Sequence, residues 1–598
     1  MSDLHASDDN DTALIPLNHG TEEDAGHLLS GDQNTTIPTI TKYSQLGDPP
    51  ENKHCFYDKG WWLDTINTIL LGFLTGTVLV CLVLLSPFLL FCSIIQRIHV
   101  ARMRYHTPPN KQRVAVIGGG WSGLQCMARL HELGVRDVKG FERYDGWGGT
   151  WHPALRYHSL QIHGPMWVTS FKDFPYSKNQ DVNDGKVLGE EALRYVDRFG
   201  KEKNLMEAYT FNAQVVEIKY SGSGSGSTRR EATLVLKDSV TGKTWTEGPY
   251  DLVIFASQAS EPCIPDIPGR KEFKGKIYHS INFKKEQYDD IVKSGKKVVV
   301  VGGSKAGCDL ALSFQRGGYD KFSWLYRTPY IFWKYEVMFH NRSITNTLRG
   351  FTTIVALLMT LVSQRLSGWI QWTSGIAVTH GIGPPHNNWS KFHFGVLCPK
   401  QRRDLSSIPK ECIIRGNPQA FTETGIRLSD GTNVAADVVL FATGCESGID
   451  KIRLIKDSTP YSLQPTTSML DHFLVPDFPV LANATTLWTT FGPVRAVNAA
   501  DMAVYHLCIR RLLTEKEMQY SAKMWQLGKT NGVTGFLFQS HTSAIKLFVL
   551  THLDLMFRGN VNVADFLVHV FQVFCLSKQT ALKIRLPKLV QASIKKHD

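Results

Sequence analysis

Two glycine-rich segments have the residue types and spacing of loops that hold the diphosphate of a dinucleotide. The first is Gly118-Gly119-Gly120-Trp121-Ser122-Gly123, which follows the apolar run 114–117 and precedes a helical pattern at 124–130. Glycine permits a tight turn and a close backbone approach, so that a diphosphate can bind at the N-terminus of the following helix. The second is Gly302-Gly303-Ser304-Lys305-Ala306-Gly307, again between an apolar run and a helical pattern. The chain is therefore predicted to bind two nucleotide cofactors.

Each loop is followed by a residue that indicates which nucleotide it binds. Glu142 ends the strand predicted after the first loop, at 138–141, and lies 142 − 123 = 19 residues past Gly123, the spacing of a carboxylate that binds ribose hydroxyls. In the second loop Ser304 replaces the middle glycine, and it is small enough for a diphosphate to approach. Arg327 follows the next strand, where a cation can receive the 2′-phosphate of NADP. The alternative for Arg327 is a solvated arginine at a strand end.

Three further motifs carry a resemblance to a known family. Residues 273–283 fit the pattern FxGxxxHxxxF over its whole length, which resembles the identifying sequence of the flavin-containing monooxygenases. Residues 147–151 resemble the GGxW element on the flavin side of that family, and residues 437–444 resemble its late strand ending in Ala-Thr-Gly. The resemblance covers roughly residues 112 to 510. Disulfide reductases also have two dinucleotide loops, but they need a redox-active cysteine pair beside the flavin. Cys126 has no near partner in the sequence, so this class of enzyme is excluded.

The resemblance implies an α/β fold with two dinucleotide-binding, Rossmann-like domains, in which an NADPH domain is inserted in an FAD domain. It implies that NADPH reduces FAD, that oxygen then forms a C4a-hydroperoxyflavin, and that one oxygen atom passes to a nucleophilic nitrogen or sulfur of a small lipophilic substrate. No metal site is expected. The predicted cofactor-binding residues are Gly118, Gly120, Trp121, Ser122, Gly123, Glu142, Arg143, Gly148, Gly149, Thr150, Trp151, Gly302, Ser304, Lys305, Ala306, Gly307, Arg327, Thr443 and Gly444.

The sequence departs from the family pattern at three places. His163 stands where animal members usually have an asparagine near the flavin, and this resembles the plant auxin-synthesising branch. His163 is the candidate catalytic residue if it faces the flavin ring; the alternative is a packed, hydrogen-bonded histidine. Gln258 replaces a glycine that is common at the first domain crossing. The signature continues with Phe283-Lys284, where Baeyer-Villiger relatives usually have tryptophan followed by proline or aspartate, which favours attack by nitrogen or sulfur.

Three other functions remain open at this stage. A Baeyer-Villiger monooxygenase would convert ketones to esters, a flavin NADPH oxidase would release hydrogen peroxide, and a non-catalytic membrane flavoprotein would bind cofactor without turnover. Composition excludes other classes: 598 residues that are 43% apolar and 20% charged form several packed units, and eleven scattered cysteines without CxxC pairs indicate no disulfide framework or zinc site. The net charge of +12 is diffuse and no nucleic-acid motif accompanies it, so no nucleic-acid partner is expected.

The N-terminal region predicts a membrane anchor. Residues 1–60 contain 11 acidic and 3 basic residues and no sustained apolar period, which is typical of a disordered tail. Residues 65–96 contain no charged residue and exceed the ~20 apolar residues that span a bilayer. Five basic residues and no acidic residue follow between 97 and 113, so the catalytic part is expected in the cytosol. We therefore expect a single-pass protein, with the endoplasmic reticulum as its membrane.

The predicted domain organisation follows the chain. It comprises a disordered acidic tail (1–60), a transmembrane helix (61–98), a basic linker (99–111), the FAD-binding domain in two parts (112–290 and 431–510), an NADPH-binding domain (291–430) with an apolar insertion (340–400), and a C-terminal helical region (511–598) that is a candidate for membrane association. The Gly-Ser repeat at 221–227 is predicted to be the tip of a β-hairpin.

Overall fold

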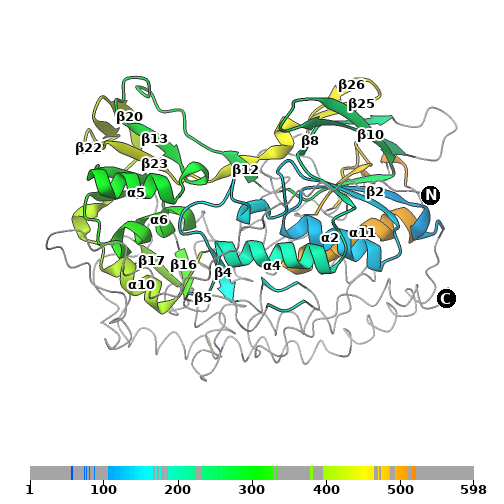
Figure 1. The fold of residues 1–598 in the computed structure, drawn as a ribbon, viewed down its shortest axis with the longest axis horizontal. Helices are drawn as coiled ribbons and strands as arrows, with labels where there is room; N and C mark the ends of the chain where they lie inside the picture. Colours follow the sequence, from blue (N-terminus) through cyan, green and yellow to red (C-terminus); the bar gives the residue numbers. More distant parts are fainter. Residues whose placement is uncertain are drawn as a thin grey trace, which may run out of the picture. The chain divides into compact units, whose positions relative to one another are not determined.

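The computed structural model describes most of residues 106–519 (Figure 1). The undescribed gaps in that range are 166–168, 172–173, 177–181, 184–185, 222–229, 258, 328–330, 335–376, 381–394, 464–468, 471–472, 485–491, 510–512 and 517. Outside it, residues 56–57 and the single positions 73, 76, 80 and 87 are described.

The first unit is built on a five-stranded parallel sheet. Its strand order is β27-β11-β2-β3-β7, with bounds Leu481–Asn483, Leu252–Phe255, Arg113–Ile117, Asp137–Phe141 and Tyr209–Thr210. All four residues of β11 are buried, which is typical of a parallel strand covered on both faces. The helices of this unit are α2 (Trp121–Glu132), α4 (Gly189–Glu202) and α11 (Gly492–Val504), which runs on into the π-helix η8 (Tyr505–Ile509).

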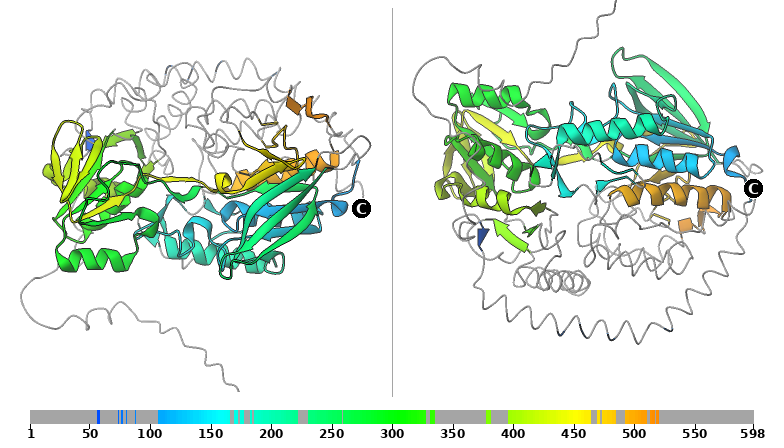
Figure 2. Two further views of the ribbon diagram at one scale, coloured as in Figure 1. Left: turned by 90° about the horizontal axis from the view of Figure 1, so that it is seen from above. Right: turned by 60° about the horizontal axis from the view of Figure 1, so that its bottom comes forward.

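Helices α2 and α11 lie side by side although more than 350 residues separate them in sequence (Figure 2). The guanidinium of Arg129 on α2 donates to the carboxylate of Asp501 on α11 at 2.9 Å, and both side chains are buried. A buried ion pair of this kind costs desolvation but penalises any arrangement that separates the two charges. The pair therefore fixes the late helix α11 against the helix that follows the first glycine loop.

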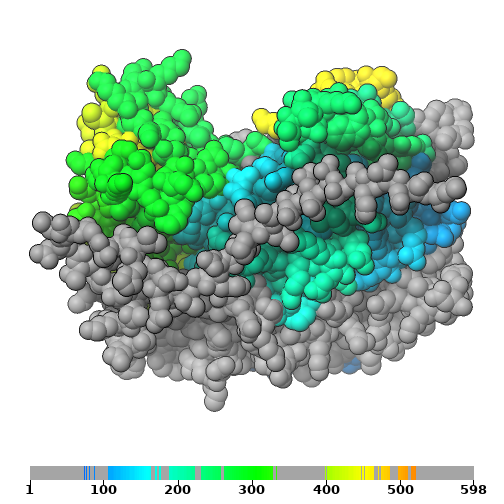
Figure 3. All heavy atoms as spheres, viewed as in Figure 1, coloured from blue at the N-terminus to red at the C-terminus, as the bar shows by residue number. Residues whose placement is uncertain are grey.

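A second sheet lies in the same unit and carries the predicted hairpin. Strands β8 (Ala213–Ser221), β9 (Glu231–Asp238) and β10 (Thr244–Tyr250) form an antiparallel meander that reaches the surface at the upper right of Figure 3. Strand β25 (Arg453–Lys456) joins β8 in parallel, and β26 (Thr459–Tyr461) closes the sheet. The predicted strands on both sides of the Gly-Ser repeat are thus confirmed as an antiparallel pair. Most of the repeat itself lies outside the described residues.

The second unit is built on another five-stranded parallel sheet. Its strand order is β13-β23-β14-β15-β19, with bounds Lys276–His279, Val438–Phe441, Val298–Val301, Phe322–Tyr326 and Ile413–Arg415. Its helices are α5 (Lys285–Ser294), α6 (Lys305–Arg316) and α10 (Pro399–Ser406). A small antiparallel sheet of β20 (Pro418–Thr422), β21 (Gly425–Leu428) and β22 (Asn433–Ala435) belongs to the same stretch of chain.

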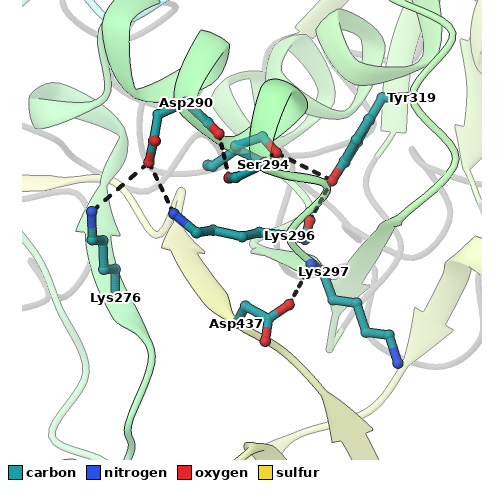
Figure 4. Close-up of polar contacts among 8 residues, drawn as sticks. Lys276, Asp290, Ser294, Lys296, Lys297, Tyr319 and Asp437 are labelled. Atoms are coloured by element: carbon teal, nitrogen blue, oxygen red, sulfur yellow. Dashed lines mark hydrogen bonds and ion pairs between the residues drawn. The ribbon is translucent and has the colours of Figure 1, made fainter.

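Polar contacts join the amino ends of the strands in this second sheet (Figure 4). The carboxylate of Asp290 accepts from Lys296 at 3.0 Å and lies 3.8 Å from the ammonium of Lys276. The backbone N–H of Lys297 donates to the Asp437 carboxylate at 2.7 Å. The Lys297–Asp437 contact joins the starts of β14 and β23, and the two Asp290 contacts join α5 to the starts of β13 and β14. The carboxyl ends of the strands lie on the opposite side of the sheet, where parallel sheets of this kind bind ligands.

The chain crosses between the two sheets twice, and the two crossings pair with each other. Strand β12 (Ala259–Pro262) leaves the first unit, and β24 (Cys445–Ser447) returns to it, antiparallel to β12. The chain between the two crossings forms the second sheet, so this unit lies within the sequence of the first. The predicted boundaries at 290/291 and 430/431 are wrong, because β13, α5 and β23 belong to the second unit.

Smaller strands complete the described part. Residues 161–188 contribute β4 (Gln161–Pro165), β5 (Val182–Asn183) and β6 (Lys186–Leu188). A four-stranded sheet has the order β1-β17-β16-β18, with bounds Phe56–Tyr57, Ala377–His380, Ile331–Lys334 and Gly395–Leu397. The prediction of a disordered tail up to residue 60 is wrong at Phe56–Tyr57, because these residues pair with β17.

The predicted transmembrane helix (61–98) lies outside the described residues except at four single positions. Within the described part of the chain, no helix combines the length and the apolar character that a bilayer crossing requires. Most of the tail, the apolar insertion and the C-terminal region also lie outside the described residues. Because hydrogen-bonded strands lie on the same side of any membrane, the pairing of β1 with β17 places residues 56–57 on the same side as residues 379–380.

The last glycine of the first loop should not tolerate a side chain. A Cβ at Gly123 would overlap the carbonyl oxygen of Gly118, whereas a Cβ at Gly146 would meet nothing within 4 Å. We expect Gly123→Ala to lower the free energy of unfolding by about 1–3 kcal/mol, the usual range for overpacking. Urea unfolding followed by tryptophan fluorescence measures the change, with Gly146→Ala as the matched control. Equal stability of the two variants would contradict the close contact.

Candidate nucleotide sites

The first glycine loop forms the turn that its sequence predicts. The backbone N–H of Gly118 donates to Phe141 on β3 at 2.8 Å, and its φ of 113° is a conformation that glycine adopts without strain. Helix α2 packs so closely on this turn that Gly123 has no room for a side chain. Gly120 is the N-cap residue of α2 and supplies no side-chain cap, so the amides of the first helical turn remain for an anion.

Glu142 lies beside this loop at the end of β3. Its buried carboxylate accepts hydrogen bonds from the backbone N–H of Gly119 at 2.5 Å and of Tyr144 at 3.1 Å. Burial raises the pKa of Glu142, while the two backbone donors and Arg143 act in the opposite direction. Arg143 in turn pairs with Glu261 at 2.6 Å. The carboxylate is thus fixed at the strand end where a ribose is expected.

A cavity of about 410 Å³ opens in front of the loop and Glu142. The turn at Gly149 contacts the loop at Gly120, since a Cβ on Gly149 would lie 2.9 Å from the Gly120 Cα. A diphosphate at the uncapped helix and a sugar at the carboxylate fit this arrangement. The predicted residues that line the cavity are Gly118, Gly120, Trp121, Ser122, Glu142, Arg143, Gly148, Gly149, Thr150 and Trp151; Gly123 does not line it and has a packing role.

Several polar residues of the cavity wall were missed by the sequence analysis. They are Gln161, Thr169, Gln214, Ser257, Glu261 and Lys451. Ser257 lies in the first crossing motif, next to Gln258, whereas the others belong to no motif quoted above. They come together because β4, β8, the end of β11 and the returning chain meet at this cavity. Their contribution to binding stays a prediction. The backbone of His163 lies in β4, two residues beyond the cavity-lining Gln161. Its side chain lies outside what the structure describes, so both interpretations of His163 stay open.

The second loop repeats the geometry of the first. Gly302 has a φ of 136°, and a Cβ on Gly307 would overlap the carbonyl oxygen of Gly302, as Gly123 would overlap Gly118. Ser304 occupies the N-cap of α6 but does not cap the helix, because its hydroxyl faces the Ala442 carbonyl at 3.5 Å. The amides of the first turn are again left for an anion, so the Gly→Ser departure preserves the property that a phosphate needs.

Lys305, the first residue of α6, is buried and pairs with the carboxylate of Asp309 one turn later. The same carboxylate oxygen accepts from the Tyr157 hydroxyl at 2.9 Å, and burial followed by the Asp309 charge raises the pKa of Tyr157. A cation at a helix N-terminus is unfavourable by itself, and Asp309 offsets it. Lys305 is thus held by Asp309, and Ala306 beside it is partly buried.

The remaining predicted residues of the second site lie at the carboxyl ends of its strands. Arg327 follows β15 and is exposed. Thr443 and Gly444 follow β23; the Thr443 hydroxyl donates to the Cys263 carbonyl, and neither residue lines the cavity of the first site. The structure therefore brings most predicted residues together in two groups, one around each loop. The binding roles of the predicted residues in both groups, Arg327, Thr443 and Gly444 included, stay predictions.

The signature at 273–283 has a structural role. A Cβ on Gly275 would overlap the carbonyl oxygen of Asp437, and Phe273 and Phe283 are buried. His279 is buried at the end of β13; its Nδ1 accepts from the N–H of Ile281 at 3.3 Å, so its Nε2–H donates to the Gly444 carbonyl at 2.8 Å. Burial lowers the pKa of His279, which keeps the ring neutral in this arrangement. The motif thus fixes the β13–β23 pair beside the second crossing.

Fold and sites together define an α/β protein with two dinucleotide-binding units. A family model described as flavin-binding monooxygenase-like matches residues 111–450, more than half of the chain. The chain belongs to this family, which consists of flavin-dependent oxidoreductases. The predicted family resemblance is confirmed.

Relatives and a solved structure agree with this assignment. Probable flavin-containing monooxygenase 1 of Arabidopsis thaliana is 26% identical over 389 residues, which cover 57% of this chain and 71% of that protein. Flavin-containing monooxygenase 5 of Rattus norvegicus is 26% identical over 361 residues, 56% of this chain and 62% of that protein. A crystal structure of cyclohexanone monooxygenase with bound ε-caprolactone has a TM-score of 0.52 at 16% identity and covers 75% of this chain and 99% of that one, a likeness of fold.

Arg327 provides a test of the second site. We expect Arg327→Ala to weaken binding of NADPH by about 1.5–3 kcal/mol, the range for a hydrogen bond to a charged group, and to leave NADH binding nearly unchanged. Lys321→Ala is the matched control, because Lys321 is exposed at the opposite end of β15. Titration calorimetry with both nucleotides measures the difference. An equal loss for NADPH and NADH would refute a 2′-phosphate contact.

Proposed function

We propose that the chain is an FAD- and NADPH-dependent monooxygenase that transfers one oxygen atom to a nucleophilic nitrogen or sulfur of a small lipophilic substrate. The observation that carries the proposal is the pair of uncapped helix N-termini, α2 and α6, each behind a glycine turn in one chain. Membership of the flavin-binding monooxygenase-like family supports the flavin as a cofactor and monooxygenation as the reaction class. FAD belongs at the first loop, where Glu142 and the cavity lie, and NADPH belongs at the second.

The cofactors supply the redox chemistry, and the chain's residues bind and orient them. In this proposal the amides of α2 and α6 hold the two diphosphates, and Glu142 binds the ribose of FAD. Apolar wall residues such as Leu155, Leu160 and Ile162 exclude water from the cavity. This division explains why a Ser/His/Asp arrangement is not required. Among the described residues, no group of acidic, histidine and cysteine side chains could hold a metal ion.

The choice of nitrogen or sulfur over a ketone rests on the end of the signature. The chain has Phe283-Lys284 at the two positions where Baeyer-Villiger relatives usually have tryptophan followed by proline or aspartate. Phe283 is fully buried and packs in the core of the second unit. The fold itself does not decide the substrate, because a ketone-oxidising enzyme shares it.

The function is tested with the purified chain in two steps. Under anaerobic conditions NADPH should bleach the bound flavin; after oxygen is admitted, an amine or thioether should be oxygenated in proportion to the NADPH consumed. Conversion of ketones to esters would favour the Baeyer-Villiger function instead. Hydrogen peroxide without oxygenated product would favour an oxidase, and a flavin that NADPH does not bleach would favour a non-catalytic flavoprotein.

His163 is the proposed catalytic residue of this reaction. A neutral imidazole beside the flavin can stabilise an oxygen species by a hydrogen bond, whereas an imidazolium can donate the proton that releases hydrogen peroxide; histidine is the side chain whose charge changes most readily near neutral pH. We expect His163→Ala to keep flavin and NADPH-driven reduction but to shift output from oxygenated product to hydrogen peroxide. Coupling in the unmodified chain should also fall on acidification. A peroxide assay beside product analysis decides: unchanged coupling at every pH would make His163 a packing residue.

We also propose that the uncharged stretch 65–96 attaches the chain to the endoplasmic reticulum membrane with the catalytic part in the cytosol, as the basic flank favours. Alkaline carbonate should not extract the protein, and protease added to sealed microsomes should digest the catalytic part. Protection of that part would reverse the orientation.

A tag placed before residue 56 distinguishes two topologies in the same protease experiment. If the stretch 65–96 crosses the membrane once, the tag lies in the lumen and is protected from the protease. The pairing of β1 with β17 instead requires residues 56–57 on the cytosolic side, and the tag is then digested together with the catalytic part.

A further inference from the structure

Residues 153–160, here called the strap, connect the flavin-side 3₁₀ turn at Gly149–Trp151 to β4. The second unit contacts the strap along its length. The backbone N–H of His158 donates to the carbonyl of Phe283 at 2.8 Å, and the Tyr157 hydroxyl donates to the carboxylate of Asp309 at 2.9 Å. The Ser159 hydroxyl donates to the Asp309 carbonyl at 3.3 Å. A segment of the first unit is therefore bonded both to the start of α5 and to the first turns of α6.

Lys284 makes the most extensive of these contacts. Its ammonium donates to the strap carbonyls of Pro153 at 2.7 Å, Ala154 at 3.2 Å and Arg156 at 2.7 Å. A lysine ammonium has three donors, so all three are used on one segment. Within the described part of the chain, Lys284 forms no ion pair with a carboxylate, so carbonyl dipoles solvate the charge. One ammonium group thus binds three carbonyl groups of the strap at once.

The opposite side of the strap faces the flavin cavity. Leu155 and Leu160 line that cavity, and Gln161 directly after the strap lines it as well. Asp309 at the other side of the strap holds Lys305, which begins the helix of the nicotinamide loop. A shift of the strap would therefore move the cavity wall relative to the second nucleotide site.

We propose that Lys284 is a positioning residue that fixes the strap, and with it the wall of the flavin cavity, against the NADPH unit. The inference rests on the proposed function, because its kinetic consequence is hydride transfer between the two cofactors. Transfer of this kind depends on near-contact geometry, where a displacement of about 1 Å can cost ~100-fold in rate. Lys284 touches neither loop, so its loss should affect the relative placement of the cofactors more than the binding of either.

The charge of Lys284 gives this contact a pH dependence. Burial, followed by the charge of Arg156, lowers the pKa of Lys284 to about 8, while Glu286 acts in the opposite direction. Of the neighbouring titratable groups, His158 and Tyr288 are neutral at that pH, because burial lowers the pKa of His158 and raises that of Tyr288. The neighbouring charged side chains are Arg156, Glu190, Lys285, Glu286 and Asp289. Above the pKa a neutral amine keeps two donors and turns a lone pair toward the carbonyls. The strap should therefore loosen as the pH rises through about 8.

The test compares Lys284→Met with Lys285→Met in the flavin-loaded chain. Lys285 is the matched control, because it is the next residue and its ammonium contacts Asp289 at 2.8 Å without reaching the strap. We expect Lys284→Met to raise hydrogen exchange in the strap and to slow anaerobic flavin bleaching by NADPH roughly 10- to 100-fold. Flavin content and the Kd for NADP⁺ should stay within about twofold, and Lys285→Met should match the parent. Lys284→Arg should restore most of the rate, because a guanidinium also donates to several carbonyls.

Three outcomes overturn the proposal. The first is unchanged exchange and rate in Lys284→Met, and the second is a loss of flavin or NADP⁺ binding as large as the loss of rate. The third is strap exchange in the unmodified chain that, after correction for the intrinsic rate, is the same below and above pH 8. This last measurement needs no variant and stands even if Lys284→Met does not fold. If NADPH does not bleach the unmodified chain, the proposed function fails, while the exchange data still decide the Lys284 contact.

Discussion

Both nucleotide sites depend on the close packing of a helix onto the turn that precedes it. At Gly123 and at Gly307 no Cβ fits, because the carbonyl oxygen of Gly118 or Gly302 occupies its place. This contact lets each helix start directly at the strand end, so that its first amides point at the ligand. With any larger residue the helix would move away and the amides with it. The cavity opens in front of the first of these two turns.

The chemistry of the two helix starts explains which substitutions the loops accept. The middle position of the loop needs a residue that does not satisfy the helix amides itself. Gly120 meets this condition because it has no side chain, and Ser304 meets it because its hydroxyl faces Ala442. Serine is among the most favoured N-cap residues, and its side chain usually accepts a hydrogen bond from an amide of the first helical turn. Ser304 makes no such hydrogen bond. An uncapped serine leaves the same amides available as a glycine does.

The sequence predicts the local parts of this structure well because they are set by short-range rules. Glycine spacing after a buried strand predicts both loops, and alternating apolar residues predict the β8–β9 hairpin. The predicted boundaries separate β13 and β23 from the second sheet, because both strands lie within motifs that the family resemblance alone does not assign to either unit. Only their parallel pairing with each other and with β14 assigns them to the second sheet.

The cavity wall shows the same limit. Glu142 was predictable because it follows its strand directly, whereas Gln161, Gln214 and Lys451 reach the cavity from distant segments. The strand β1 was missed for a related reason: two residues have too little pattern to be recognised, and only their partner β17 defines them.

The signature motif separates what identifies the family from what performs its chemistry. Gly275 packs against the residue before β23, Phe273 and Phe283 are buried, and His279 donates to the carbonyl of Gly444 at the crossing. None of the four lines the cavity of the first site. A motif that joins two units can be as specific as one that touches a substrate, because the geometry between two cofactors tolerates little displacement. Lys284, the residue after the motif, extends the same joint to the strap. The identifying sequence of this chain therefore makes contacts between the two units, through the His279–Gly444 and Phe283–His158 hydrogen bonds, and lies outside the cavity.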